Sequence, residues 1–464
     1  MIKIEYLPGA VLTIYLFLTI LEYMVSPWNW PTKNPELLYF FVFTVNTVFF
    51  LGYWAAIHKR NKSESNDLIL NHNFDVGNKW FKVGLIVSVI AIYPRMVTVV
   101  GRFDFSLSTM WALFLNGLSN AGVAYSEKVL FHGEDTSSTN ALTLLMLALN
   151  PLRFFVLTWG IFFWKKYSVM IKLGLLLMIV CEIVSYIIIG TNKGLFELLC
   201  WIPFLVAASI CSYRDSAGSA HGKVPGAPER PAIKRNLFKK IVLIVLGTCA
   251  LFSAIGYFSQ GQEERRKDYL FKDIGAETNL NMNHVVMRTL PDKLAISYAM
   301  LDQYLCQGYY GLDKCLGLNF VYTYGLGNSI FLTYFIGQRF FGAGMAIENS
   351  TYPARLELLT GYSSLNRWLS CYSWWAGDLT FPGVIIAVFF VGYALGCAWL
   401  DILYQRIPTA FPIFALFAIM VFYFPANNQI LYFSGSCIAF LVCFALWLIF
   451  RHRGTRRRWS VQEV

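Results

Sequence analysis

The residues of this chain that could do chemistry are arginines, aromatic residues and a few carboxylates within one long hydrophilic stretch, residues 260–383. Planar guanidinium groups bind phosphate oxygens through two parallel hydrogen bonds. Aromatic faces beside polar groups suit sugar rings, which present apolar C–H faces and hydroxyl edges. The pattern predicts a site for a phosphorylated sugar. The alternative is a belt of Trp and Tyr at a membrane surface, with each arginine paired to an acid.

Motifs for other chemistries are missing from the sequence. It contains no P-loop, no GxSxG motif, no HExxH motif and no clear DxD-type metal site. Residues 260–383 contain one histidine, His284, and the ten cysteines of the chain show no CxxC spacing. Nucleotide hydrolysis and metal catalysis therefore have little support. We predict neither a cofactor nor a metal.

A second candidate anion site is the sequence IIIGTNKGLF, residues 187–196. Its lysine, Lys193, follows an apolar segment, where a charge is costly unless it reaches the interface or binds an anion. A helix that begins at about Lys193 would also direct free N–H groups towards an anion. The alternative is a plain turn between helices with a lysine that extends to the interface.

Charged residues also interrupt the apolar segments themselves. Arg95 and Arg153 lie towards one end of their segments, and an arginine at membrane depth is a functional hypothesis by default. Extension of the side chain to the interface is the alternative. Glu22 and Glu182 are intramembrane carboxylates, and either could be a buried partner of an arginine or lysine.

Composition indicates the elements that must position these residues. The chain has 464 residues, of which 56% are hydrophobic, 17% aromatic and 14% charged, with a mean hydropathy of +0.51. A soluble domain carries roughly 25% charged residues, and ~20 apolar residues span a bilayer. We predict an all-α polytopic membrane protein with about ten transmembrane helices. They fall near residues 8–26, 37–57, 80–100, 141–164, 168–190, 195–211, 241–259, 384–404, 409–425 and 430–450.

The distribution of basic residues predicts the orientation. Lysine and arginine cluster after residue 57, at residues 165–166, in residues 212–240 and in the C-terminal tail. With ten spans, these four segments and both termini share one side, which the positive-inside rule makes the cytoplasm. The net charge of +11 is therefore explained by topology rather than by nucleic-acid binding.

The opposite side receives residues 260–383, with ten Lys/Arg against eleven Asp/Glu. A loop of this length should be an ordered unit. Within it we expect short helices at Asp292 to Gln303 and at Tyr352 to Leu359, and an amphipathic or re-entrant segment at Ser329 to Phe341. The predicted parts are an N-terminal bundle of about seven helices (1–259), this large loop (260–383), C-terminal transmembrane helices (384–450) and a basic cytoplasmic tail (451–464).

The centre of the loop is a Gly/Tyr block, QGYYGLDKCLGLNFVYTYGLGNS, residues 307–329, with little helical periodicity. We expect its glycines to let the backbone turn and approach a ligand, and its tyrosines to bind sugar. A compact loop with its tyrosines in the membrane interface is the alternative. An oxidising compartment would permit Cys306 to pair with Cys315, with Cys371 as a competing partner.

Three motifs carry a resemblance to a known family. The junction Gly190-Thr191-Asn192-Lys193 resembles the GT(R/N) turn of O-antigen polymerases. The sequences QGYYGL (307–312) and YTYGLGNS (322–329) resemble a Gly/Tyr block of bacterial oligosaccharide repeat-unit polymerases, and RWLSCYSWWAGDLTFPG (367–383) resembles the segment that leads into their next transmembrane helix. The chain is therefore similar to the Wzy-type family, whose GT-C-like architecture is related to that of O-antigen ligases.

The resemblance implies an activity. Such polymerases transfer a growing glycan from undecaprenyl diphosphate onto a new lipid-linked repeat unit, at the outer face of the bacterial inner membrane. The partners implied are the undecaprenyl-diphosphate-linked donor and acceptor, membrane lipid and a Wzz-type chain-length regulator, with no nucleic acid. Displacement of a diphosphate needs positive charge where negative charge develops, and the acceptor hydroxyl is helped by a carboxylate or histidine.

These roles give three sets of candidate residues. The diphosphate-binding candidates are Lys193, Arg153, Arg288, Arg355 and Arg367. The candidates for the catalytic base are Asp378, Asp302 and His284, with Asp378 first because it precedes a predicted span. The glycan-binding candidates are Tyr309, Tyr310, Tyr324, Trp374 and Trp375.

Other functions remain open at this point. An O-antigen ligase would share the fold and the lipid donor but would transfer finished polymer. A transporter or flippase would be expected to show polar residues in several central spans and an inverted repeat, which the sequence does not show. A purely structural membrane partner is less attractive because of the large aromatic outer loop.

Overall fold

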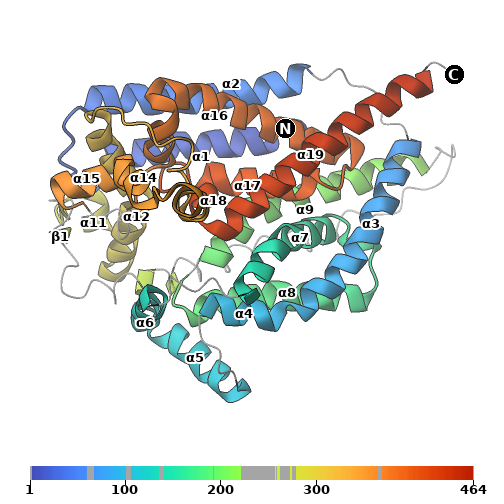
Figure 1. The fold of residues 1–464 in the computed structure, drawn as a ribbon, viewed down its shortest axis with the longest axis horizontal. Helices are drawn as coiled ribbons and strands as arrows, with labels where there is room; N and C mark the ends of the chain where they lie inside the picture. The colour runs from blue at the N-terminus through green and yellow to red at the C-terminus, as the bar shows by residue number, and fades with distance from the viewer. Residues whose placement is uncertain are drawn as a thin grey trace.

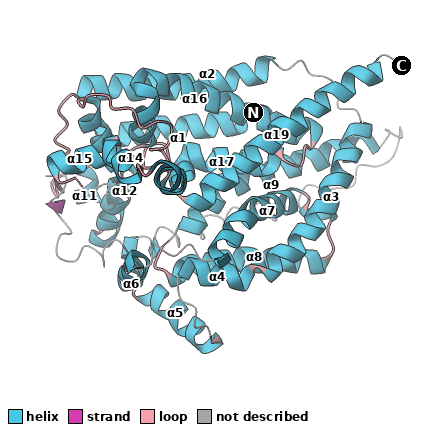
Figure 2. Cartoon of the chain, in the orientation of Figure 1, coloured by secondary structure: helices cyan, strands magenta, loops and turns pink. Residues whose placement is uncertain are grey.

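The chain is an all-α polytopic membrane protein. Its computed structural model describes residues 3–59, 67–100, 106–134, 141–191, 193–220, 256–257, 259–261, 272–273, 278–362 and 368–462. Within these ranges helices account for most of the structure, and the strands are a two-residue antiparallel pair, β1 (Lys272–Asp273) and β2 (Thr278–Asn279) (Figure 2).

Seven helical segments in the described ranges are long and apolar enough to cross a membrane, and a bent pair makes up to eight. The seven are Ile4–Met24, Pro35–Lys59, Ala141–Phe162, Val169–Ile188, Lys193–Ser212, Cys371–Gln405 and Ser434–His452. The bent pair joins Leu70–Ile90 to Ile92–Val100 at an angle of 52°. Of the predicted span at 241–259, residues 241–255 and 258 lie outside the described residues.

These segments belong to numbered helices. The N-terminal half contains η1 (Ile4–Tyr6), α1 (Leu7–Met24), α2 (Pro35–Lys59), α3 (Asp67–Ile90), α4 (Ile92–Val100), α5 (Leu107–Ser119), α6 (Ala121–Glu134), α7 (Ala141–Phe162), η2 (Trp164–Lys166), α8 (Val169–Ile188) and α9 (Lys193–Ala220). The C-terminal half contains α11 (Val285–Thr289), α12 (Asp292–Leu316), the π-helix η4 (Phe331–Gln338), α13 (Arg339–Phe341), α14 (Gly344–Ser350), α15 (Tyr352–Thr360), α16 (Cys371–Gln405), α17 (Ala410–Phe422), α18 (Gln429–Tyr432) and α19 (Ser434–Gln462).

The helices form an elongated bundle with a cap at one end. Helices α1, α2, α16 and α19 run along the long axis, and α11, α12, α14 and α15 gather at the end opposite the C-terminus (Figure 1). Helix α17 lies inside the bundle, with nearly every side chain buried. At 13 residues it is shorter than the ~20 residues that span a bilayer. A helix that is apolar all round is a buried one, so α17 forms the core of the bundle.

Helices α2 and α16 pack closely through two glycines. A Cβ atom added at Gly52 would lie 2.1 Å from the carbonyl oxygen of Phe389, and one at Gly392 would lie 2.2 Å from that of Phe49. Small residues let transmembrane backbones approach, so that van der Waals contact holds the helices together.

Helix α16 is broken near its start. Thr380 has φ 63° and ψ 163°, a conformation that is essentially restricted to glycine, and Pro382 follows it. The break leaves a short first part, from Cys371 to the break, that carries Trp374, Trp375 and Asp378. From the sequence we predicted that the span starts at residue 384, because the helical turns before the break carry no clear signal.

The first half of the Gly/Tyr block is helical, which corrects the expectation of a loop. Residues 307–316 complete α12, so Gly308 does not form a turn. Instead, a Cβ atom at Gly308 would lie 2.0 Å from the carbonyl oxygen of Pro425, and the glycine lets two backbones touch. The second half of the block is irregular, with positive φ at Tyr324 (56°) and Gly325 (74°).

The proposed cysteine pairing is also wrong. Cys306, Cys315 and Cys371 are free and buried. Cys306 and Cys315 both lie in α12, and nine residues of α-helix separate two positions by about 13 Å, which is beyond the reach of a disulfide. The short helix expected at Tyr352 to Leu359 is confirmed as α15. The helix expected at Asp292 to Gln303 begins at Asp292 but continues to Leu316, so α12 is longer than predicted.

One contact ties α12 to the start of α2. The carboxylate of Asp313 accepts hydrogen bonds from the backbone N–H of Lys33 (2.7 Å) and of Asn34 (3.0 Å). Both groups immediately precede α2, where free N–H groups and the helix dipole favour an anion. A side chain of the cap therefore fixes the first turn of a transmembrane helix.

We predict that Gly392→Val destabilises the bundle by about 1–3 kcal/mol or more, because overpacking at a backbone contact forces the helices apart. The midpoint of thermal unfolding in detergent should fall. The control is Ile386→Val on the same helix, where the side chain is 61% exposed. Equal unfolding midpoints for the two variants would contradict this account of the α2–α16 contact.

Candidate functional site

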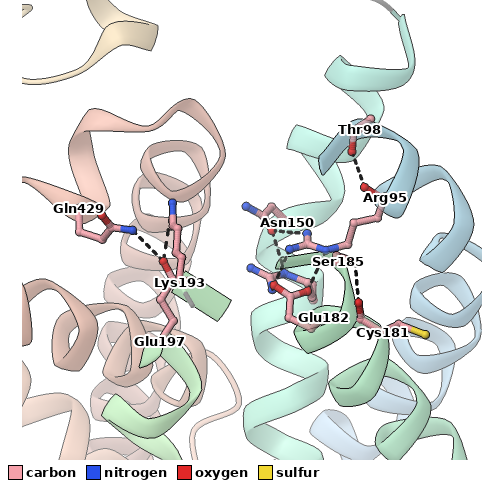
Figure 3. Close-up of polar contacts among 10 residues, drawn as sticks. Arg95, Thr98, Asn150, Cys181, Glu182, Ser185, Lys193, Glu197 and Gln429 are labelled. Atoms are coloured by element: carbon pink, nitrogen blue, oxygen red, sulfur yellow. Dashed lines mark hydrogen bonds and ion pairs between the residues drawn. The ribbon is translucent and has the colours of Figure 1, made fainter. Parts of the chain in front are cut away.

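Three charged side chains from three helices meet between the apolar segments. Arg95 of α4 donates to Glu182 of α8 through Nε (2.9 Å to Oε2) and Nη2 (2.8 Å to Oε1). Arg153 of α7 donates to the same carboxylate through Nη1 (2.6 Å to Oε1). Figure 3 shows the fork of Arg95 on Glu182. One buried carboxylate thus holds two guanidinium groups, and this trio, the Arg–Glu–Arg cluster, has a net charge of +1.

Asn150 completes the cluster from α7. Its side-chain oxygen accepts from Nη1 of Arg95 (3.3 Å) and from Nε of Arg153 (3.0 Å). Residues three apart share one helix face, so Asn150 and Arg153 reach the cluster together. A buried charge is tolerated only when it is paired and hydrogen-bonded. The cluster meets this requirement for Glu182, while the arginines keep an excess positive charge.

The cluster forms the polar side of a pocket, pocket A, whose open space is about 540 Å³. Arg95, Asn150, Arg153, Glu182 and Ser185 line it, and the remaining wall is mostly apolar. The apolar wall includes Val87, Ala91, Ile92, Met96, Met146, Leu149, Leu157 and Met178. A cationic group on an apolar wall suits an anion that carries a hydrocarbon chain.

A second charged group lies beside the cluster. The Nζ of Lys193 is 3.8 Å from Oε1 of Glu197 and 3.9 Å from the ring centroid of Phe433. Gln429 of α18 donates to the same Glu197 oxygen (3.0 Å). Lys193 interacts electrostatically with Arg95, Arg153 and Glu182. Figure 3 shows the Lys193–Glu197 group and the Arg–Glu–Arg cluster in one view. Together the two groups hold three cations and two carboxylates.

The sequence predicted part of this arrangement. It proposed Arg153 and Lys193 as phosphate ligands, and the structure brings them to one region. It also named Glu182 as a buried partner for an arginine, which is confirmed. Helix α9 begins at Lys193, as expected. Arg95 was recognised as an intramembrane arginine but was not among the predicted phosphate ligands. Glu197 and Gln429 lie in no sequence motif and were not predicted.

The other proposed phosphate ligands lie elsewhere. Arg288 is an exposed residue of α11. Arg355 of α15 donates to the carbonyl oxygen of Asn319 (2.8 Å). Its Nε and Nη2 are buried, and neither has a hydrogen-bond partner among the residues that the structure describes. Arg367 lies outside the described residues.

Asp378, the first candidate for the base, anchors a loop. Its Oδ1 accepts from the Thr323 hydroxyl (2.6 Å) and the Gly325 N–H (2.8 Å), and its Oδ2 accepts from the Asn328 amide (2.6 Å). These donors belong to the irregular half of the Gly/Tyr block. These three hydrogen bonds use both oxygens of the carboxylate, so the geometry gives Asp378 a positioning role.

Asp302 and His284 occupy different surroundings. Asp302 is 2% exposed and accepts from the Ser26 hydroxyl (2.5 Å) and the Cys306 thiol (3.2 Å). Burial raises the pKa of Asp302 to about 7, and the neighbouring Glu22 acts in the same direction. His284 precedes the short helix α11, and its Nδ1 is buried. The structure does not bring these residues together with Asp378.

The aromatic candidates separate into buried and open positions. Tyr309 and Tyr310 are fully buried, and Tyr309 shares a 2.8 Å hydrogen bond with Thr19. Trp375 is buried against Phe424, with ring centroids 5.6 Å apart. These three side chains pack the core, which is not compatible with the expected role as sugar platforms. Tyr324 is 72% exposed, and Trp374 lines a second pocket.

No family model, curated protein or solved structure matches this chain. Its function therefore has to be inferred from the chemistry of its own residues.

We predict that Glu182→Gln destabilises the protein by about 3–5 kcal/mol, because two buried arginines lose their counter-charge. The thermal unfolding midpoint in detergent should drop well below that of the wild type. Glu36→Gln, at an exposed position of α2, should change the free energy of unfolding by about 0.5 kcal/mol or less. If Glu182→Gln had the same unfolding midpoint as the Glu36→Gln control, the cluster would not hold the three helices together.

We also predict a pH dependence that originates at Asp302. The folded protein keeps this carboxyl protonated up to about pH 7, whereas an unfolded chain ionises it near about pH 4. The folded state binds the extra proton, so the free energy of unfolding falls as the pH rises through that window. The unfolding midpoint should decrease between about pH 4 and about pH 7, and less so in Asp302→Asn. Asp292→Asn, exposed on the same helix, should keep the wild-type slope, and equal slopes in all three proteins would refute the assignment.

Proposed function

We propose that this protein is a glycosyltransferase that polymerises oligosaccharide repeat units carried on undecaprenyl diphosphate. The observation that carries the proposal is pocket A, where two arginines with excess positive charge face an apolar wall between membrane-spanning helices. A polyprenyl diphosphate has matching parts, because it joins an anionic head to a long hydrocarbon chain.

The chemistry of the transfer fits this arrangement. A hydroxyl of the acceptor sugar attacks the anomeric carbon of the donor, and the bond from that carbon to the diphosphate oxygen breaks. Negative charge grows on the leaving diphosphate, and fixed guanidinium groups in a place of low dielectric constant stabilise it most effectively. Arg95 and Arg153 are held by Glu182 and Asn150, so they require little reorganisation as charge develops.

The position of Lys193 supports the same function. Its amine lies at the start of α9 and beside the Arg–Glu–Arg cluster, where helix N–H groups also favour an anion. The C-terminus and the capping helices α11, α12, α14 and α15 lie at opposite ends of the bundle (Figure 1). In the topology we propose, both termini are cytoplasmic, and the cap faces the periplasm of a bacterial inner membrane.

We predict that deletion of the gene in its bacterial host collapses the ladder of surface polysaccharide to a single repeat unit on a gel. The wild-type gene should restore the ladder, and Arg153→Ala should not, because the leaving group loses a cation. Arg288→Ala removes an exposed arginine of the cap and should restore it. Immunoblots of the membrane fraction must show equal amounts of each variant.

The same gel separates the alternatives. Deletion of an O-antigen ligase would leave no repeat unit attached to the acceptor, whereas deletion of a polymerase leaves a single repeat unit. An unchanged ladder would overturn the proposed function altogether. Restoration of the ladder by Arg153→Ala would remove pocket A from the mechanism.

A further inference from the structure

A second pocket, pocket B, lies among the elements that follow α12. It opens between the π-helix η4, helices α14 and α15, the first part of α16, and α18, and its open space, which includes solvent at its mouth, is about 370 Å³. Its lining residues are Gly327, Ile330, Thr333, Tyr334, Glu348, Thr351, Ala354, Trp374 and Tyr432.

The lining combines aromatic faces with a single acid. The rings of Trp374 and Tyr432 lie 4.8 Å apart between centroids, at 54°. The hydroxyl of Tyr334 donates to the carboxylate of Glu348. Burial, and after it the charge of Glu348, raises the pKa of both Tyr334 and Tyr432 to about 12. The carboxylate is therefore bonded to one phenol and interacts electrostatically with the other.

One donor in this lining has no partner. The indole Nε1 of Trp374 is buried and makes no hydrogen bond within the described ranges, and the residue as a whole is 9% exposed. An unsatisfied buried donor costs about 1–3 kcal/mol. An oxygen atom that enters the pocket would remove this cost, so the indole N–H points to a ligand with oxygen acceptors.

We propose that pocket B binds a neutral saccharide. Sugar rings offer C–H faces to Trp374 and Tyr432, hydroxyl donors to the carboxylate of Glu348, and oxygen acceptors to the indole N–H of Trp374. The negative charge of Glu348 disfavours phosphates and acidic sugars, because a like charge in a confined site is repelled. Threonine hydroxyls at Thr333 and Thr351 add further polar partners.

The segment around α18 links pocket B to Lys193 and Glu197, which lie beside the Arg–Glu–Arg cluster of pocket A. Tyr432 lines pocket B, Phe433 lies under the Lys193 amine, and Gln429 binds Glu197. One helical turn thus contacts the sugar pocket and the cationic region. This inference rests on the proposed function in one respect, since it assigns pocket B to the glycan of a lipid-linked substrate whose diphosphate lies in pocket A.

The test measures binding of free sugars to the full-length protein in lipid nanodiscs. The probes are methyl glycosides of glucose, galactose, rhamnose and N-acetylglucosamine, detected by saturation-transfer NMR. At least one should bind the wild type, and its Kd should rise about tenfold or more in Glu348→Gln, because a hydrogen bond to a charged group contributes about 1.5–3 kcal/mol. Trp374→Phe keeps a ring but removes the N–H, and it should weaken binding several-fold.

Trp111→Phe is the matched control, because Trp111 is an exposed tryptophan of α5 outside the lining of pocket B. Its Kd should equal that of the wild type, and all three variants must unfold at the wild-type temperature. The proposal is overturned when no glycoside of the panel binds, or when Glu348→Gln binds as tightly as the control. Glycoside binding that survives in Arg153→Ala, with the polysaccharide ladder lost, supports both proposals. If glycosides bind but the deletion strain keeps an unchanged ladder, pocket B remains a saccharide site and the proposed polymerase function is refuted.

Discussion

The structure depends on one carboxylate that neutralises two arginines in an apolar environment. Glu182 accepts from Arg95 and Arg153, so α4, α7 and α8 can pack with cations between them. Desolvation of an ion is costly, and a buried pair breaks even only when its geometry is good and its remaining donors are satisfied. Asn150 supplies that further satisfaction. A purely structural cluster could use one arginine or none, and the second arginine leaves an uncompensated positive charge.

The elements that follow α12 depend on a different set of polar contacts. Asp378 anchors the irregular loop of residues 323–328 to the first part of α16. Asn428 continues this connection, because its side-chain amide donates to the carbonyl oxygen of Asn328 (2.9 Å). The loop, the broken helix and α18 therefore form one hydrogen-bonded assembly. Pocket B borders this assembly, which gives the positions of its lining residues a common physical cause.

Much of the fold could be predicted because apolar segment length is a strong signal. Most predicted spans correspond to a helix. The span predicted at 409–425 corresponds to α17, which is apolar, buried and shorter than the other candidates. The buried ion cluster was partly predictable, since Glu182, Arg95 and Arg153 interrupt apolar sequence. The helical state of residues 307–316 was not predictable from their many glycines, because tertiary contacts such as that of Gly308 override local propensity. Glu348 and Tyr432 of pocket B lie in no motif, and only the folded chain brings them together.

The contact between Asp313 and the start of α2 has a consequence for how the chain is made. The carboxylate lies 280 residues after the backbone N–H group that it binds. Helix α2 enters the membrane early in translation, and its first turn lacks this acceptor until α12 has been synthesised. The same holds for its glycine contact with α16, which arrives later still. The N-terminal helices of this protein therefore lack both contacts until the C-terminal half has been synthesised. Until then, the insertion machinery or lipid must cover the surfaces of these helices.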